Sequence, residues 1–248
     1  VFSAGETMRL RLEDLPIAQI SIVVLLVEVL LLASLLLLPT GLALRRRLGQ
    51  GGQQGLIAVV FSGYGFAFML VEIVLIQILT RIVGEPVWSI VGVLAVLLVS
   101  SGIGSALFAG RLLWSPQRGT LLAAMAAMSV AICLPAAVDA LEHFPLGARV
   151  FAAALMVLPV GLFLGIPFSS TLQHIKEPQD TAWAWAVNSV SSVGGSIAAL
   201  ILCSSIGLRL SAMIAASVYL LIYPALAGLV KPGAVLGSTG SGEHEQRL

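Results

Sequence analysis

The stretch from Val87 to Gly110, VWSIVGVLAVLLVSSGIGSALFAG, contains no charged side chain. A helix that crosses a lipid bilayer needs about 20 apolar residues in a row, and this stretch meets that length. Over the whole chain 58% of residues are hydrophobic and 10% are charged, and the mean hydropathy is +1.04. Soluble domains carry roughly 25% charged residues. Because so few charges could not cover a soluble surface, the sequence indicates a multi-pass membrane protein.

The apolar stretches are separated by short connections that contain Pro, Gly or charged residues. They predict an all-α bundle of seven membrane-spanning helices. The seven expected spans cover residues 17–39, 56–80, 87–110, 120–140, 149–172, 183–206 and 210–230. We expect residues 1–16 to form a juxtamembrane linker, residues 17–230 the bundle, and the Gly- and Ser-rich residues 231–248 a disordered tail.

The basic residues are distributed unequally between the two predicted sides of the membrane. One side carries eight of them: Arg45, Arg46, Arg47, Arg111, Arg118, Lys176, Lys231 and Arg247. The other side carries five: Arg9, Arg11, Arg81, Arg149 and Arg209. Basic residues accumulate on the cytoplasmic side of membrane proteins, so we expect the N-terminus outside and the C-terminus in the cytoplasm.

Small residues recur four positions apart in several predicted spans. Close packing of helices in lipid depends on such residues, so these pairs predict helix-helix contacts. The pairs are Gly63/Ala67, Ser101/Ser105, Ala106/Gly110, Gly161/Gly165 and Gly194/Ala198.

Four polar residues inside predicted spans are candidates for a binding site: Glu28, Glu72, Gln77 and Asn188. An ionisable side chain at the bilayer centre costs about 2.5–3.5 kcal/mol on insertion scales, so it normally faces the bundle or a wet cavity. Glu72, with Gln77 on the same predicted helix, is consistent with a proton or cation site. The alternative is a hydrogen-bonded carboxyl group that fixes helix register. Asn188 either lines a site or makes an interhelical hydrogen bond.

Several functional classes are excluded by residues that are missing. A retinal Schiff base needs a lysine within the last span, whereas Lys176 and Lys231 lie at predicted surfaces. Haem between helices needs intramembrane histidines, whereas His143, His174 and His244 lie in loops or the tail. The sequence has no nucleotide-binding loop, zinc-protease motif or catalytic triad. With a net charge of +1 it has no nucleic-acid-binding patch. We therefore predict no catalytic residue, no metal site and no cofactor.

Six motifs of the chain form a recognisable set. They are MRLRLEDL (8–15), GFAFMLVEIVLIQ (65–77), GEP (84–86), SSGIGS (100–105), LPVGLFLGIPF (158–168) and AWAVNSVSSVGGS (184–196). This set resembles the membrane region of bacterial spermidine-synthase-like membrane proteins, in which a polyamine-synthase-type domain is fused to membrane spans. The resemblance covers most of residues 8–225. Ser169, Ala186 and Ser189 depart from the family pattern, which has Pro after the Pro-Phe pair and Gly around the Asn.

The resemblance implies a module of the bacterial inner membrane, without the soluble synthase-like domain among its residues. We therefore expect a non-catalytic multi-pass module with a transporter-like role, for which a polyamine or another cation is the natural cargo. The alternative is a structural or accessory subunit that packs within a larger membrane complex. Expected partners are the lipid bilayer, other membrane subunits or a synthase-like soluble domain. Whether Val1 is the native N-terminus is left open by the sequence.

Overall fold

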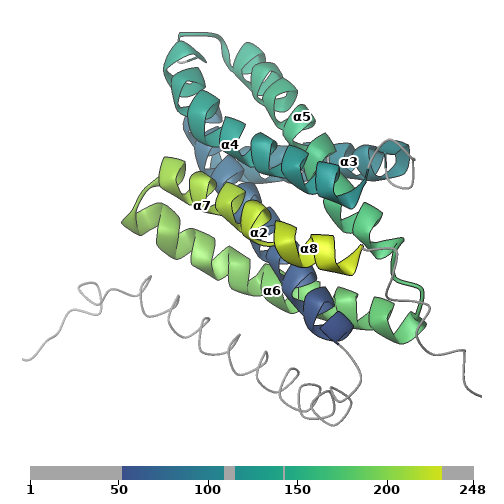
Figure 1. Cartoon of the computed structure of the whole chain (residues 1–248). Helices are drawn as coiled ribbons and strands as arrows, with labels where there is room; N and C mark the ends of the chain where they lie inside the picture. Colours follow the sequence, from purple (N-terminus) through teal and green to yellow (C-terminus); the bar gives the residue numbers. More distant parts are fainter. Residues whose placement is uncertain (1–51, 109–114, 142, 231–248) are drawn as a thin grey trace, which may run out of the picture. The chain divides into compact units, whose positions relative to one another are not determined.

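A computed structural model describes residues 52–108, 115–141 and 143–230, which belong to one compact unit (Figure 1). The described residues form helices joined by short turns, and none of them lies in a strand. The helices are α2 (Gly52–Val83), α3 (Pro86–Phe108), α4 (Pro116–Leu141), α5 (Leu146–Leu172), α6 (Pro178–Ser205), α7 (Leu208–Leu221) and α8 (Tyr223–Leu229).

Five of the described helical segments are long and apolar enough to cross a membrane: α2, α3, α5, α6 and the joined α7 and α8 (Leu208–Leu229). This result confirms the all-α class and is compatible with a multi-pass membrane protein. Seven spans are not confirmed. The predicted span 17–39 lies outside the described residues, as do the predicted linker and tail. The predicted span 120–140 is helical, as α4, but is not among the five.

The predicted last span, 210–230, contains a break. Helix α7 ends at Leu221 and α8 begins at Tyr223, with Ile222 between them. Pro224 stands in the first turn of α8, where its missing N–H costs no helical hydrogen bond. The break in this span therefore falls at a proline, whereas α5 continues through Pro159 and Pro167.

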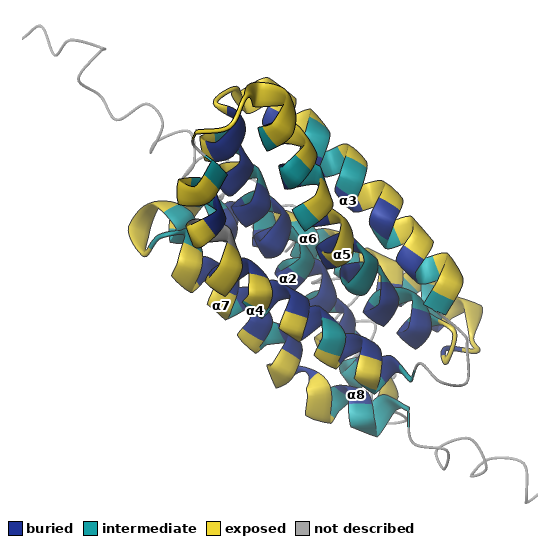
Figure 2. Ribbon diagram, turned by 90° about the horizontal axis from the view of Figure 1, so that it is seen from above, coloured by how far each residue is buried: buried dark blue, intermediate teal, exposed yellow. Residues whose placement is uncertain are grey.

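Helix α2 is the centre of the described bundle. It contacts each of the other described helices, and half of its residues are buried (Figure 2). The surrounding helices turn large apolar side chains outward, among them Val87, Trp88 and Leu98 of α3 and Phe151 of α5. An apolar exterior of this kind suits lipid rather than water, so the burial pattern agrees with a bilayer environment.

Helices α3 and α5 pack with almost no space between their backbones. A methyl group at Gly104 would overlap the carbonyl oxygen of Leu162, and one at Gly165 would overlap that of Ser101. A methyl group at Gly161 would overlap the Ser100 hydroxyl. The two helices therefore run parallel with glycines at the contact, which confirms the predicted contacts at Ser101/Ser105 and Gly161/Gly165.

Helices α2 and α6 make the second close contact. Gln54 Nε2 donates a hydrogen bond to Asp180 Oδ1 over 3.1 Å near the N-terminal ends of both helices. Further along, a methyl group at Gly195 would lie 2.7 Å from the Phe66 carbonyl oxygen. These contacts occur in the same order along both helices, so α2 and α6 are also parallel.

The predicted contact at Gly194/Ala198 is wrong by one residue. Gly194 has no neighbour within 4 Å of the position of a Cβ atom, whereas Gly195 packs on α2 and Ala199 is fully buried. Successive helical residues are rotated by about 100°, so only one of two adjacent glycines can face a given partner. Gly63 and Ala67 are buried, as predicted, and Gly63 packs against Ile222. Gly110 lies outside the described residues.

Substitution of Gly165 by Ala tests the α3–α5 contact. The added methyl group forces the backbones apart, so we expect the free energy of unfolding to fall by about 1–3 kcal/mol. The matched control is Gly92→Ala in α3, where nothing lies within 4 Å of the new atom. That variant should be as stable as the wild type or slightly more stable, because Ala is the better helix former. Unfolding by SDS in mixed micelles, followed by circular dichroism, measures both variants. An equal loss in both would contradict the contact.

Candidate functional site

The structure brings together only part of the site predicted from the sequence. Glu72 is buried in α2 with 7% of its surface exposed, and it has no hydrogen-bond or ion-pair partner among the described residues. Gln77 lies further along the same helix and is exposed. Asn188 lies on α6 beside Gly65 of α2. Glu28 lies outside the described residues. Of these four, Asn188 lines the cavity described next, and the binding role of the others stays a prediction.

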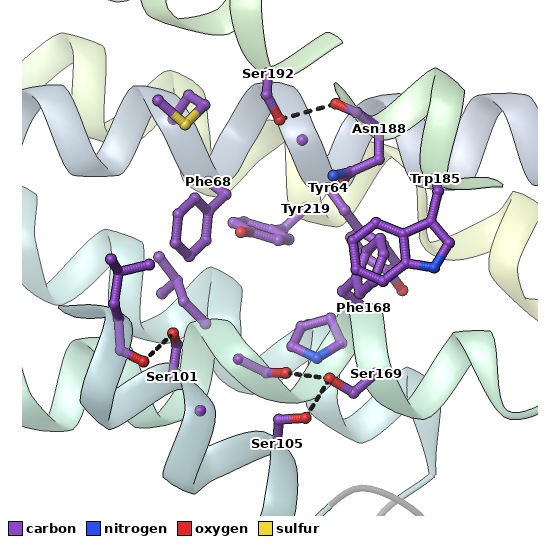
Figure 3. Close-up of a pocket in the computed structure, with 17 residues that line it drawn as sticks. Tyr64, Phe68, Ser101, Ser105, Phe168, Ser169, Trp185, Asn188, Ser192 and Tyr219 are labelled. Carbon is purple, nitrogen blue, oxygen red and sulfur yellow. Dashed lines mark hydrogen bonds between the residues drawn. The ribbon is translucent and has the colours of Figure 1, made fainter. Parts of the chain in front are cut away.

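A cavity of about 460 Å³ lies between the two close helix pairs, α2 with α6 and α3 with α5 (Figure 3). Residues of α2, α3, α5 and α6 line it, and Tyr219 of α7 adds to the lining. Binding pockets for small molecules usually measure about 300–1,000 Å³. The size of the cavity is therefore sufficient for a small organic molecule.

Aromatic side chains form much of the cavity wall. The rings of Phe168 and Trp185 meet edge to face with 4.7 Å between centroids. Phe61, behind Phe168, meets it edge to face at 5.2 Å. The rings of Tyr64 and Tyr219 are 6.3 Å apart. Because edge-to-face contacts fix the orientation of rings, this wall is preorganised.

The polar groups of the cavity are hydroxyl groups and one amide. Ser105 donates to Ser169 Oγ over 2.6 Å, and Ser169 donates to the Gly165 carbonyl oxygen over 3.0 Å. Ser192 donates to the backbone carbonyl oxygen of Asn188 over 2.8 Å (Figure 3). The side chain of Asn188 has no hydrogen-bond partner among the described residues. No charged side chain belongs to the described lining.

The cavity opens sideways between α3 and α6. Leu98 of α3 and Trp185 of α6 both line it, yet 61% and 51% of their surfaces are exposed. Gly102 of α3 is also exposed and lines it. Helix α3 packs mainly on α5 and α2 and has no extensive contact with α6. Within the described bundle, the opening therefore lies on the apolar side surface rather than at an end of the helices.

A group of three hydroxyls lies beside the cavity and joins three helices. Tyr64 Oη lies 2.8 Å from Thr120 Oγ1 of α4 and 3.0 Å from Thr171 Oγ1 of α5. The threonines also donate to the carbonyl oxygens of Pro116 and Pro167, respectively. The three hydroxyl groups have one proton each, but they make four contacts: two between Tyr64 and the threonines and two between the threonines and backbone carbonyl oxygens. When both threonines donate to their own helices, only the Tyr64 proton is left, and Tyr64 donates it to one threonine at a time. This group holds the cavity wall on α2 in place.

The spacing of small, polar and aromatic residues in two spans could have indicated the cavity. Trp185 and Asn188 are three residues apart, so they lie on one face of α6. Gly102 and Ser105 have the same spacing on α3. Small and polar residues in spans indicate packing seams, and here the same faces also border an open space. Only the relative placement of α3 and α6 distinguishes the two cases.

Comparisons of the chain with protein-family models, with curated proteins and with solved structures found no match. Within the described ranges, no group of three or more His, Cys, Asp or Glu side chains is arranged to hold a metal ion.

Replacement of Tyr64 by Phe removes one hydroxyl from the group that joins α2, α4 and α5. We expect the free energy of unfolding to fall by about 1–2 kcal/mol, because up to two buried hydrogen bonds are lost. Tyr223→Phe is the control, since Tyr223 is exposed and no hydrogen bond of its hydroxyl is seen. It should change the stability by less than about 0.5 kcal/mol. Equal effects of the two substitutions in the same unfolding assay would mean that the hydroxyl group contributes nothing.

Proposed function

We propose that the chain is a non-catalytic, multi-pass membrane module that binds a small molecule in the cavity between α2, α3, α5 and α6 and has a transporter-like role. The observation that carries the proposal is this cavity inside an apolar bundle, with aromatic walls and an Asn188 side chain that has no partner among the described residues. Concave sites with apolar walls and few polar groups are typical of small-molecule binding. A purely structural bundle gains nothing from such a space, because empty volume costs packing energy.

The resemblance to spermidine-synthase-like membrane proteins supports a bacterial inner-membrane location and a polyamine or another cation as cargo. Glu72 is the acidic group that a cation would need, but it does not line the cavity. Burying an ion costs several kcal/mol, whereas an aromatic ring returns about 2 kcal/mol through a cation-π contact. The cavity itself therefore favours a cargo with little or no charge, and a polyamine requires Glu72 to take part.

An accessory role within a larger membrane complex is the second candidate. The observation that favours it is the outer face of α3, where Val87, Trp88, Val91, Leu98 and Val99 are all exposed. A face of this kind is covered by lipid chains or by the helices of another subunit. A subunit with this role needs the outer face and not the cavity, so a variant with a blocked cavity separates the two candidates.

Substitution of Gly102 by Trp fills the mouth of the cavity, because nothing lies within 4 Å of the position of its Cβ atom. The matched control is Gly92→Trp on the same helix, which is equally free of neighbours but does not line the cavity. If a polyamine is the cargo, uptake of radiolabelled spermidine into proteoliposomes should exceed that of empty liposomes, fall at least tenfold in Gly102→Trp, and persist in Gly92→Trp. Uptake no higher than that of empty liposomes would contradict polyamine transport.

The same assay tests the role of Glu72. If a cation is the cargo, Glu72→Gln should reduce uptake to the level of empty liposomes, because the neutral amide cannot compensate the charge of the cargo. Gln53→Leu, at an exposed polar position on the same helix, should leave uptake unchanged. Unchanged uptake in Glu72→Gln would show that Glu72 only fixes helix packing.

A further inference from the structure

We infer that the ligand of the cavity is a neutral, membrane-dissolved ring compound with carbonyl oxygens, of the chemical class of quinones. The inference rests on the proposed function in one respect: it takes the cavity to be a ligand site. It does not require that the ligand is transported.

Two side chains that line the cavity have hydrogen-bond donors without an acceptor among the described residues. The side-chain amide of Asn188 has no partner among the described residues, and Figure 3 shows its nitrogen turned toward the cavity. Tyr219 lines the cavity with only 1% of its surface exposed, and no described residue accepts a hydrogen bond from its hydroxyl. Tyr219 is buried and Asn188 is partly buried. A buried donor without a partner is costly, so a ligand that offers acceptor oxygens to both groups is favoured.

The serine hydroxyls do not compete as donors. Ser101 and Ser192 donate to the backbone of their own helices, and Ser105 donates to Ser169. Their protons are used, so they offer a ligand only lone pairs. Among the amide and hydroxyl donors of the described lining, those of Asn188 and Tyr219 are therefore left to bind a carbonyl oxygen.

The uncharged lining of the cavity disfavours charged ligands. Neither a carboxylate nor a basic side chain belongs to the described lining. The idealised cost of moving an ion from water into a medium of low dielectric constant exceeds a single cation-π attraction roughly tenfold. A cation or an anion would thus enter the cavity without compensation, whereas a neutral carbonyl compound pays no such cost.

The aromatic wall fits a flat ring. Phe168 and Trp185 stand at one side of the cavity and Phe68 at the other, with Tyr219 between them in the view of Figure 3. A planar ring can stack on one of these side chains and meet another edge to face. The opening between α3 and α6 exposes Leu98 and Trp185 on the apolar side surface, where a ligand dissolved in lipid would enter.

The test uses two probes of nearly the same shape. The first is 2,3-dimethyl-1,4-naphthoquinone, which carries two carbonyl oxygens and, being methylated at both free ring positions, does not alkylate Cys133 or Cys203. The second is 2,3-dimethylnaphthalene, which has the ring but no acceptor. Binding of each tritiated probe to the protein in nanodiscs is measured by dialysis, and empty nanodiscs correct for partition into lipid. We expect saturable binding of the quinone, at least five times tighter than that of the hydrocarbon.

Two variants assign the donors. Asn188→Leu keeps the size of the side chain and removes the amide, and Tyr219→Phe removes only the hydroxyl. Each should weaken quinone binding by about three- to tenfold and leave hydrocarbon binding unchanged. Gln53→Leu, which removes an exposed amide of α2 outside the cavity, should change neither. Equal weakening for both probes in both variants would mean that no carbonyl group is recognised.

Other outcomes separate the inference from the proposed function. Absence of saturable quinone binding together with spermidine uptake that Gly102→Trp abolishes would overturn the inference and leave the proposed function intact. Saturable quinone binding that Gly102→Trp abolishes, without any uptake of spermidine, supports the inference and argues against polyamine transport. Preferential binding of benzyltrimethylammonium over the quinone would overturn the inference in favour of a cation-π site.

Discussion

The close contact between α3 and α5 determines most of what is distinctive in this bundle. Gly104, Gly161 and Gly165 let the two backbones touch, and any side chain at these positions would overlap a neighbouring backbone or hydroxyl atom. In lipid no hydrophobic force draws helices together, so close packing of this kind is what holds them. Because α3 is held on α5, it stands away from α6. The space left between them is the cavity and its lateral opening.

The second close pair, α2 with α6, supplies the opposite wall. Gly65 and Gly195 allow α6 to lie on the most buried helix of the described bundle, and this places Trp185 and Asn188 beside the cavity. The Tyr64 hydroxyl lies within hydrogen-bond distance of Thr120 of α4 and Thr171 of α5, and so links α2 to both helices. Each wall is thus rigid on its own, while the seam between α3 and α6 is open. A small-molecule site with access from the membrane needs this combination.

The sequence predicted the helices better than the site. Uncharged runs such as 87–110 predict long apolar helices by length and composition alone, and α3 confirms this for residues 87–108. Small residues four apart marked the α3–α5 contact correctly. The residue at which α6 contacts α2 was harder to predict. Gly194 and Gly195 are both glycines in the same span, and only the packing shows that Gly195 faces α2. The cavity could not be predicted because it depends on where α3 and α6 do not touch. Asn188 was a candidate because amides are rare in spans, whereas Tyr219 was not among the candidates.

The parallel pairing of α3 and α5 is the central claim, and a disulfide measures it most directly. Ser105 and Ser169 have their hydroxyl oxygens 2.6 Å apart. Cysteines at both positions, in a variant without Cys133 and Cys203, should cross-link rapidly in native membranes under mild oxidation, as detected by mass spectrometry of the linked peptides. Cysteines at Ser105 and Val190 should not cross-link. A cross-link from Ser105 to α6 in place of the one to Ser169 would mean that α3 closes on α6 and that the cavity does not exist.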